Sequence, residues 1–258
     1  MLRFSVNAPP DIAGLCVRPL CFAAVGDEFY GIPTVQQLLG EEAAPSLHRF
    51  GLQGSCTLME YRGVRAFVFT KHQIARIPNE TAKSFIARMD LLHPLIDDGR
   101  DGYNLPYRWV LAGHGEDDLG DFVIAITESS MLTDYMLSCF FPVERGSKGW
   151  VGDEAMAAGY PHHLQSLLME TNGNRTVPFP ISGQIVSRTD GATAHFTSSD
   201  TATSLDGMSG GPVFVVRLIS GEQAASFIDG IVQRGGNGNV RYLTIERVLD
   251  RIDVFLDT

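Results

Sequence analysis

The chain has 258 residues, of which 44% are hydrophobic and 19% are charged, a composition typical of a folded globular protein rather than a disordered one. Its net charge of −10 disfavours nucleic acid as a partner, because an acidic surface repels phosphate. No apolar stretch approaches the roughly 18 residues needed to cross a bilayer, so we expect no membrane partner.

The N-terminus and the cysteines bear on the compartment. Residues 1–11 lack a basic segment followed by a continuous apolar one, which disfavours export. The four cysteines show no zinc-binding spacing, and we predict free thiols in a reducing compartment, hence a cytoplasmic protein. A disulfide between Cys16 and Cys21 remains an alternative.

The first half of the chain changes character near Gly51. Residues 1–45 predict an irregular extension with one short helix, over Thr34–Leu39. Two runs rich in β-forming residues, Ser55–Tyr61 and Val64–Thr70, flank a short turn and predict a hairpin. Apolar residues at helical spacing predict an inserted helix over Thr81–Ile96.

Short strands then recur between turn residues, the pattern of an all-β barrel or sandwich. A glycine-containing segment at 144–152 predicts the boundary between two β halves. Apolar residues spaced among charges predict an amphipathic terminal helix over Ile245–Leu256. The predicted strands are Tyr107–Ala112, Phe122–Thr127, Ala155–Ala158, Gly183–Ser187, Pro212–Leu218, Ser226–Val232 and Val240–Thr244.

The segment Asp206–Phe214 places Ser209 among glycines, directly before Pro212 and an apolar strand. This arrangement puts the serine hydroxyl on a tight turn at the edge of a strand. Gly207 can adopt a positive φ, which would aim its N–H and that of Ser209 at one point, as a developing oxyanion requires. The alternative is a glycine-rich hairpin turn in which Ser209 caps the bend.

The stretch Gly207–Pro212 resembles the nucleophile turn of the chymotrypsin-like serine peptidases, Gly-x-Ser-Gly-Gly-Pro, at every fixed position. Ala66–His72 resembles the family's strand leading to the catalytic histidine, with Lys71 in place of the usual small residue. Asp121 opens an apolar strand, as the family's catalytic aspartate does. Asp118 is the rival acid, but Gly120 and Asp121 interrupt the strand that would follow it.

The resemblance covers roughly residues 50–258 and implies two packed six-stranded β-barrels of the chymotrypsin type. It divides the chain into an N-terminal extension (1–45), a first barrel (46–146) and a second barrel with the terminal helix (147–258). Weaker matches at Gly159-Tyr160-Pro161 and Gly230–Gly235 agree with this alignment.

The resemblance also implies chemistry: a serine endopeptidase that acts on a peptide or protein substrate without a metal or organic cofactor. His72, Asp121 and Ser209 would form the triad, and Gly207 with Ser209 the oxyanion hole. Control by a regulatory protein partner is left open. The substrate pocket would be formed by Thr203, Ser204, Val232, Gln233, Arg234 and Gly235.

Thr203 stands six positions before the serine, where family members that cleave after Arg or Lys have an acidic residue. We therefore expect an uncharged pocket that prefers medium apolar or small polar side chains. The adjacent His162 and His163 are interpreted as ordinary residues rather than metal ligands.

Two other functions are alternatives to the peptidase. One is a catalytically silent scaffold of the same fold. The other is an α/β-hydrolase esterase, whose Gly-x-Ser-x-Gly pattern Gly207–Gly211 also satisfies. That family has its triad in the order Ser, Asp, His, whereas His72 and Asp121 precede the serine here, so chain order excludes it.

Overall fold

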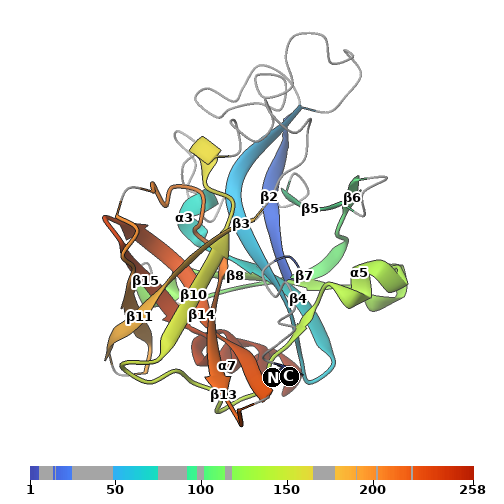
Figure 1. Ribbon diagram of the computed structural model, residues 1–258. Helices are drawn as coiled ribbons and strands as arrows, with labels where there is room; N and C mark the ends of the chain where they lie inside the picture. Colours follow the sequence, from blue (N-terminus) through green and yellow to red (C-terminus); the bar gives the residue numbers. More distant parts are fainter. Residues whose placement is uncertain are drawn as a thin grey trace.

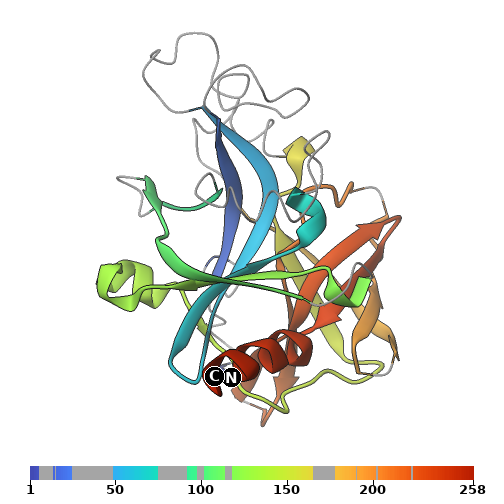
Figure 2. The same ribbon diagram turned by 180° about the vertical axis from the view of Figure 1, so that it is seen from behind.

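Two mainly antiparallel sheets pack against each other in the computed structural model, with the N- and C-terminal residues close together on one side (Figures 1 and 2). The structure describes residues 1–5, 14, 16–24, 49–74, 92–97, 102–113, 118–164, 178–189, 191–201, 203–221 and 223–258.

The first sheet has the strand order β6-β5-β2-β3-β4-β8-β7, with β9 beside β3. Its central hairpin turns at Arg62 (φ 51°) and Gly63 (φ 79°), the two positive φ values that a tight two-residue turn requires. The strands are β2 (Val17–Ala24), β3 (Arg49–Tyr61), β4 (Val64–Phe69), β5 (Leu92–Asp97), β6 (Gly102–Asn104), β7 (Tyr107–Ala112), β8 (Val123–Thr127) and β9 (Phe141–Pro142).

The second sheet is a closed six-stranded barrel, because β15 pairs with both β12 and β14. Going round it, the order is β14-β13-β10-β11-β12-β15, and β1 adds to the outside of β14. The strands are β1 (Leu2–Ser5), β10 (Glu154–Gly159), β11 (Phe179–Thr189), β12 (Thr193–Thr197), β13 (Pro212–Leu218), β14 (Gln223–Gly236) and β15 (Asn239–Thr244).

Helices are short except for α7 (Ile245–Leu256), which follows the second barrel and runs beside both sheets (Figure 2). It buries one apolar stripe in the same core as β3, β4 and β8 of the first sheet. On its other side, Arg145 forms ion pairs with carboxylates of α7. The C-terminal helix therefore ties the two sheets together. The remaining helices are α3 (Lys71–Ile74), η2 (Asp118–Gly120), η3 (Ser129–Met131) and α5 (Asp134–Ser138).

The all-β architecture, the hairpin of β3 and β4 and the terminal helix confirm the sequence-based predictions. The N-terminal region was predicted wrongly as irregular, since β1 joins the second sheet and β2 the first. Their edges are completed by partners distant in sequence, which no local pattern reveals. None of the described helices is long and apolar enough to cross a membrane.

The predicted inserted helix is wrong over its last part, because Leu92–Asp97 form strand β5 against β2. Alternation and helical spacing are hard to separate in so short an apolar run. The rest of that prediction, and the helix over Thr34–Leu39, lie outside the described residues. The alternative disulfide is also absent, since Cys16 is a buried free thiol. Burial raises the pKa of this thiol.

One buried charge stabilises the second barrel. Asp229 on β14 has a fully buried side chain, paired with Arg188 of β11 at 2.7 Å. Its carboxylate also accepts hydrogen bonds from the Tyr242 hydroxyl at 2.6 Å and the Gly149 amide at 2.7 Å. Burial and this carboxylate raise the pKa of Tyr242, so the phenol remains a donor.

We predict that Asp229→Ala lowers the free energy of unfolding by about 3–5 kcal/mol, because it leaves a largely buried guanidinium without its partner. Asp250→Ala is the control: its carboxylate pairs with Arg145 at the surface and should cost about 1 kcal/mol or less. Urea denaturation of both variants measures the difference. Equal losses would show that the buried pair has no special role.

Candidate active site

His72 lies at the start of a single helical turn that follows the buried strand β4. Strand β4 ends at Phe69 and α3 begins at Lys71. His72 contacts Ser209 of the second sheet, so its imidazole lies at the junction of the two sheets. Lys71, the departure from the family motif, points away from the imidazole and donates to the carbonyl of Gly113 at 2.6 Å. That contact ties α3 to the segment after β7.

Asp121 lies between η2 and β8, just before the strand that pairs with β4. One carboxylate oxygen is 2.7 Å from Nδ1 of His72, and the other accepts the backbone N–H of His72 at 3.0 Å. This double contact fixes both the position and the tautomer of the imidazole. The neighbouring Phe122 is buried and anchors the strand end. The side chain of the rival Asp118 lies outside what the structure describes.

Ser209 comes from the second barrel, in the turn before β13. Its Oγ lies 3.0 Å from Nε2 of His72 and 2.9 Å from the carbonyl oxygen of Gln233, to which it donates. The structure therefore brings His72, Asp121 and Ser209 into one hydrogen-bonded chain. A serine that merely capped its own bend would not contact a distant histidine.

The turn before Ser209 is oriented by contacts on both sides. The carbonyl of Asp206 accepts the backbone N–H of His162 at 2.9 Å, and in a trans peptide the following N–H, that of Gly207, points the opposite way. The carbonyl of Gly207 accepts the Ser55 hydroxyl at 2.7 Å. Among the described residues, the amides of Gly207 and Ser209 donate to no protein acceptor. They are available to an incoming oxyanion.

Gly207 adopts φ +97°, a conformation that only glycine reaches without strain. A methyl group at this position would lie 2.4 Å from the carbonyl oxygen of Tyr160. The sequence-based assignment of a positive φ to this glycine is therefore confirmed. The tight packing therefore leaves no room for a side chain at this position.

The expected pocket residues come from two segments, residues 232–235 on β14 and residues 203–204 before the serine turn. Gln233 is buried and its carbonyl contacts Ser209, while Arg234 and Gly235 are exposed beyond it. The amide and carbonyl of Val232 pair with the turn that carries the serine.

Thr203 and Ser204 lie before the nucleophile turn, and Ser204 is exposed. The Thr203 hydroxyl donates to the carboxylate of Asp200 at 2.7 Å. Asp200 therefore brings a negative charge close to Thr203, which the sequence analysis missed.

Two further polar residues at this site were missed. Ser55 and Gln73 both contact the segment that carries Ser209. Gln73 follows His72 directly, so its position alone could have drawn attention to it, whereas Ser55 is distant from both motifs. His162, one of the paired histidines, lies 3.5 Å from the Asp206 carboxylate through Nδ1.

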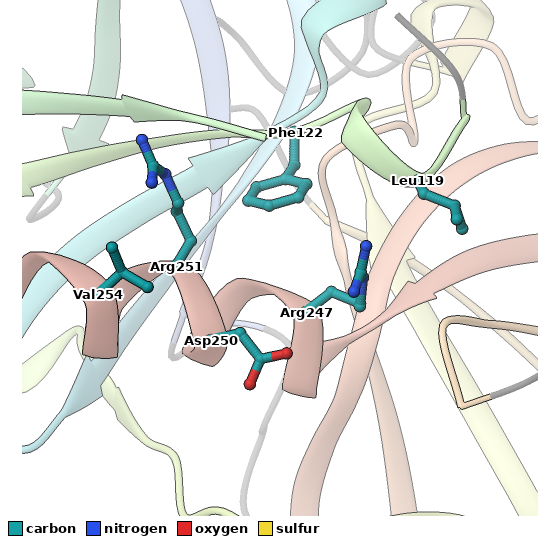
Figure 3. Close-up of a pocket in the computed structure, with 6 residues that line it drawn as sticks. All are labelled: Leu119, Phe122, Arg247, Asp250, Arg251 and Val254. Atoms are coloured by element: carbon teal, nitrogen blue, oxygen red, sulfur yellow. The ribbon is translucent and has the colours of Figure 1, made fainter. Parts of the chain in front are cut away.

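A pocket of about 180 Å³ lies near the start of β8, between α7 and the segment that joins η2 to β8 (Figure 3). Phe122 forms its base, and no member of the His72–Asp121–Ser209 chain lines it. It is therefore separate from the candidate site. The lining residues are Leu119, Phe122, Arg247, Asp250, Arg251 and Val254.

The closed barrel, the second sheet packed against it and the C-terminal helix decide the fold. The chain has the trypsin-like fold. An HtrA-type protease, AlgW, solved with a decapeptide, matches over 95% of this chain with a TM-score of 0.53 and 16% identity. This chain spans 65% of that protease.

Two further structures match the trypsin-like fold over nearly their whole length. HBP matches over 98% of this chain and 96% of its own with a TM-score of 0.55 and 10% identity. Kallikrein-related peptidase 10 matches over 96% and 98%, with a TM-score of 0.53 and 11% identity. No protein-family model and no curated protein matched the sequence. At these identities the comparisons show the fold, and function rests on the site.

We predict that Gly207→Ala strongly slows labelling of Ser209 by a fluorophosphonate probe, because the methyl group displaces the turn that presents the two free amides. Removing one oxyanion donor costs about 10²–10³-fold in other enzymes. Gly146→Ala is the matched control, with a similar φ of +83° and no atom near the added methyl group. Equal labelling of both variants would contradict the assignment of this turn.

Proposed function

We propose that this protein is a serine endopeptidase that hydrolyses peptide bonds through an acyl-enzyme intermediate. One observation carries the proposal: the imidazole of His72 contacts the Asp121 carboxylate at 2.7 Å through Nδ1 and the Ser209 hydroxyl at 3.0 Å through Nε2. These groups have the geometry of a nucleophile, a base and an orienting acid. The trypsin-like fold supports the same reading.

The contact with Asp121 keeps the ring proton on Nδ1, which leaves Nε2 as an acceptor. In the resting arrangement the Ser209 hydroxyl donates to the carbonyl of Gln233. A small rotation about the Cβ–Oγ bond directs that proton to Nε2, since both acceptors are within 3.0 Å. His72 then accepts the proton as Oγ attacks the scissile carbonyl, and Asp121 stabilises the imidazolium.

The tetrahedral oxyanion would lie between the amides of Gly207 and Ser209. His72 returns its proton to the leaving amine, and the acyl group remains on Ser209. Water, deprotonated by the same imidazole, then releases the acid product. Each of these steps uses groups of the chain itself, so we propose no cofactor.

For the substrate, we propose peptides with a medium apolar or small polar side chain before the cleaved bond. The residue at the pocket position, Thr203, carries no charge, although Asp200 lies beside it. A peptide-library profile dominated by cleavage after Arg or Lys would show that Asp200 reaches the pocket and would overturn this preference. The cytoplasmic location and a regulatory partner remain predictions from the sequence.

The competing function is a silent scaffold of the trypsin-like fold. We predict that Ser209→Ala lowers peptide turnover by about 10⁴–10⁶-fold, because the nucleophile is removed, while the melting temperature stays within a few degrees. Mass spectrometry of fluorophosphonate-treated protein supplies the second readout, with the adduct expected on Ser209. A wild-type protein that neither cleaves peptides nor takes the label would favour the scaffold.

We predict that Asp121→Asn lowers turnover by about 10⁴-fold, because an amide no longer holds the imidazole in the required tautomer. Asp118→Asn is the matched control, because it makes the same chemical change three residues away in the chain. It should stay within about threefold of the wild type. Steady-state kinetics of both variants decide which acid serves the triad, and a dead Asp118→Asn would reverse the assignment.

A further inference from the structure

Gln73 follows His72 on α3 and is only 2% exposed. Its Oε1 accepts the backbone N–H of Thr70 at 2.8 Å and the Thr70 hydroxyl at 2.9 Å. Its Nε2 donates to the carbonyl of Ser55 at 3.1 Å and to the carbonyl of Ser209 at 2.8 Å. A side-chain amide has two N–H groups and two acceptor lone pairs, so this one is fully satisfied.

The surroundings are shaped to this amide. A methyl group on Gly54 of β3 would lie 2.5 Å from Nε2 of Gln73. One on Gly210, directly after the serine, would lie 2.9 Å from Oε1. Backbone from both sheets therefore approaches the Gln73 side chain more closely than any residue with a Cβ would allow. The Gln73 amide therefore fits closely between glycine backbones of the two sides of the junction.

We propose that Gln73 is a positioning residue that sets the distance between His72 and Ser209. This inference rests on the proposed peptidase function. The base and the nucleophile come from different sheets, so their 3.0 Å contact depends on the junction between them. Gln73 bridges that junction from the residue next to the base to the main chain of the nucleophile. The hydroxyl oxygen of its Thr70 partner lies 3.4 Å from Nε2 of His72, where it can accept a hydrogen bond once Nε2 has taken the serine proton.

Removing the two N–H groups while keeping the shape isolates this role. In Gln73→Glu, both acceptor contacts with Thr70 can persist, but an ionised carboxylate would face the carbonyls of Ser55 and Ser209 with no hydrogen to donate. Burial raises the pKa of such an introduced carboxyl. When protonated it can again donate one hydrogen bond to a carbonyl. Through Thr70, the Gln73 side chain neighbours the titratable His72, which in turn contacts Asp121.

We expect Gln73→Glu to react with a fluorophosphonate probe about 10–100-fold more slowly than wild type at pH 8, since misplacement by about 1 Å can cost that much. The ratio of variant to wild-type rate should rise as the pH falls and the introduced carboxyl protonates. In peptide hydrolysis, the same variant should lose activity through a lower kcat, with KM within about threefold of the wild-type value. Gln184→Glu, on the exposed face of β11, is the control for an added carboxylate and should match wild type at every pH. A flat ratio, or a ratio near one at pH 8, would overturn the proposal.

A second measurement does not need a working enzyme. The NMR chemical shift of Nε2 of His72 should change when Ser209→Ala is made in the wild-type background, because Nε2 loses its partner. The same substitution in a Gln73→Met background should produce a much smaller shift, since Ser209 is no longer held against the imidazole. Equal shifts in both backgrounds would refute the role of Gln73. Absent probe labelling of wild type with unequal shifts would refute the peptidase function and leave Gln73 as the element that holds the contact.

Discussion

The geometry of the site depends on the carbonyl oxygen of Ser209, which accepts hydrogen bonds from the Ser55 amide at 3.1 Å and from Gln73 at 2.8 Å. Ser55 lies on β3 of the first sheet and Gln73 on α3, which follows β4 of the same sheet, whereas the serine lies in the turn before β13 of the second sheet. The proposed nucleophile is thus fixed by its main chain while its hydroxyl stays mobile between two acceptors. A hydroxyl attack needs this combination, because the carbon framework must stay still while one proton moves.

The same junction also orients the peptide that precedes the nucleophile. Ser55 accepts the amide of Tyr160 at 2.8 Å and donates to the carbonyl of Gly207, so one hydroxyl links both barrels to the turn. Thr57, two residues further along β3, makes a similar contact, because its hydroxyl donates to the carbonyl of Gly210 at 2.9 Å. The carbonyls of Gly207 and Gly210 therefore point toward β3 of the first sheet. The serine turn is therefore shaped by its neighbours as much as by its glycines.

Away from the site, the two barrels are joined by different physical means. Helix α7 contributes apolar side chains to the core of the first sheet although it follows the last strand of the second. Surface ion pairs of Arg145 with this helix add little individually, because solvent screens them. Burial of the apolar stripe is the larger effect. A rigid junction between barrels is what a site divided between them requires.

The sequence by itself determined the strand-rich class, the hairpin of β3 and β4 and the terminal helix, and it predicted the three residues of the proposed triad. These depend on short-range signals: alternation, turn residues, and motifs in which a glycine or a strand end lies beside the functional side chain. Tertiary structure alone decided the strands β1, β2 and β5, whose hydrogen-bond partners lie far along the chain. It also decided the contacts that Ser55 and Gln73 make with the segment carrying Ser209, since neither residue stands in a motif. A hydrogen bond across two sheets has no sequence period, so only the folded junction reveals it.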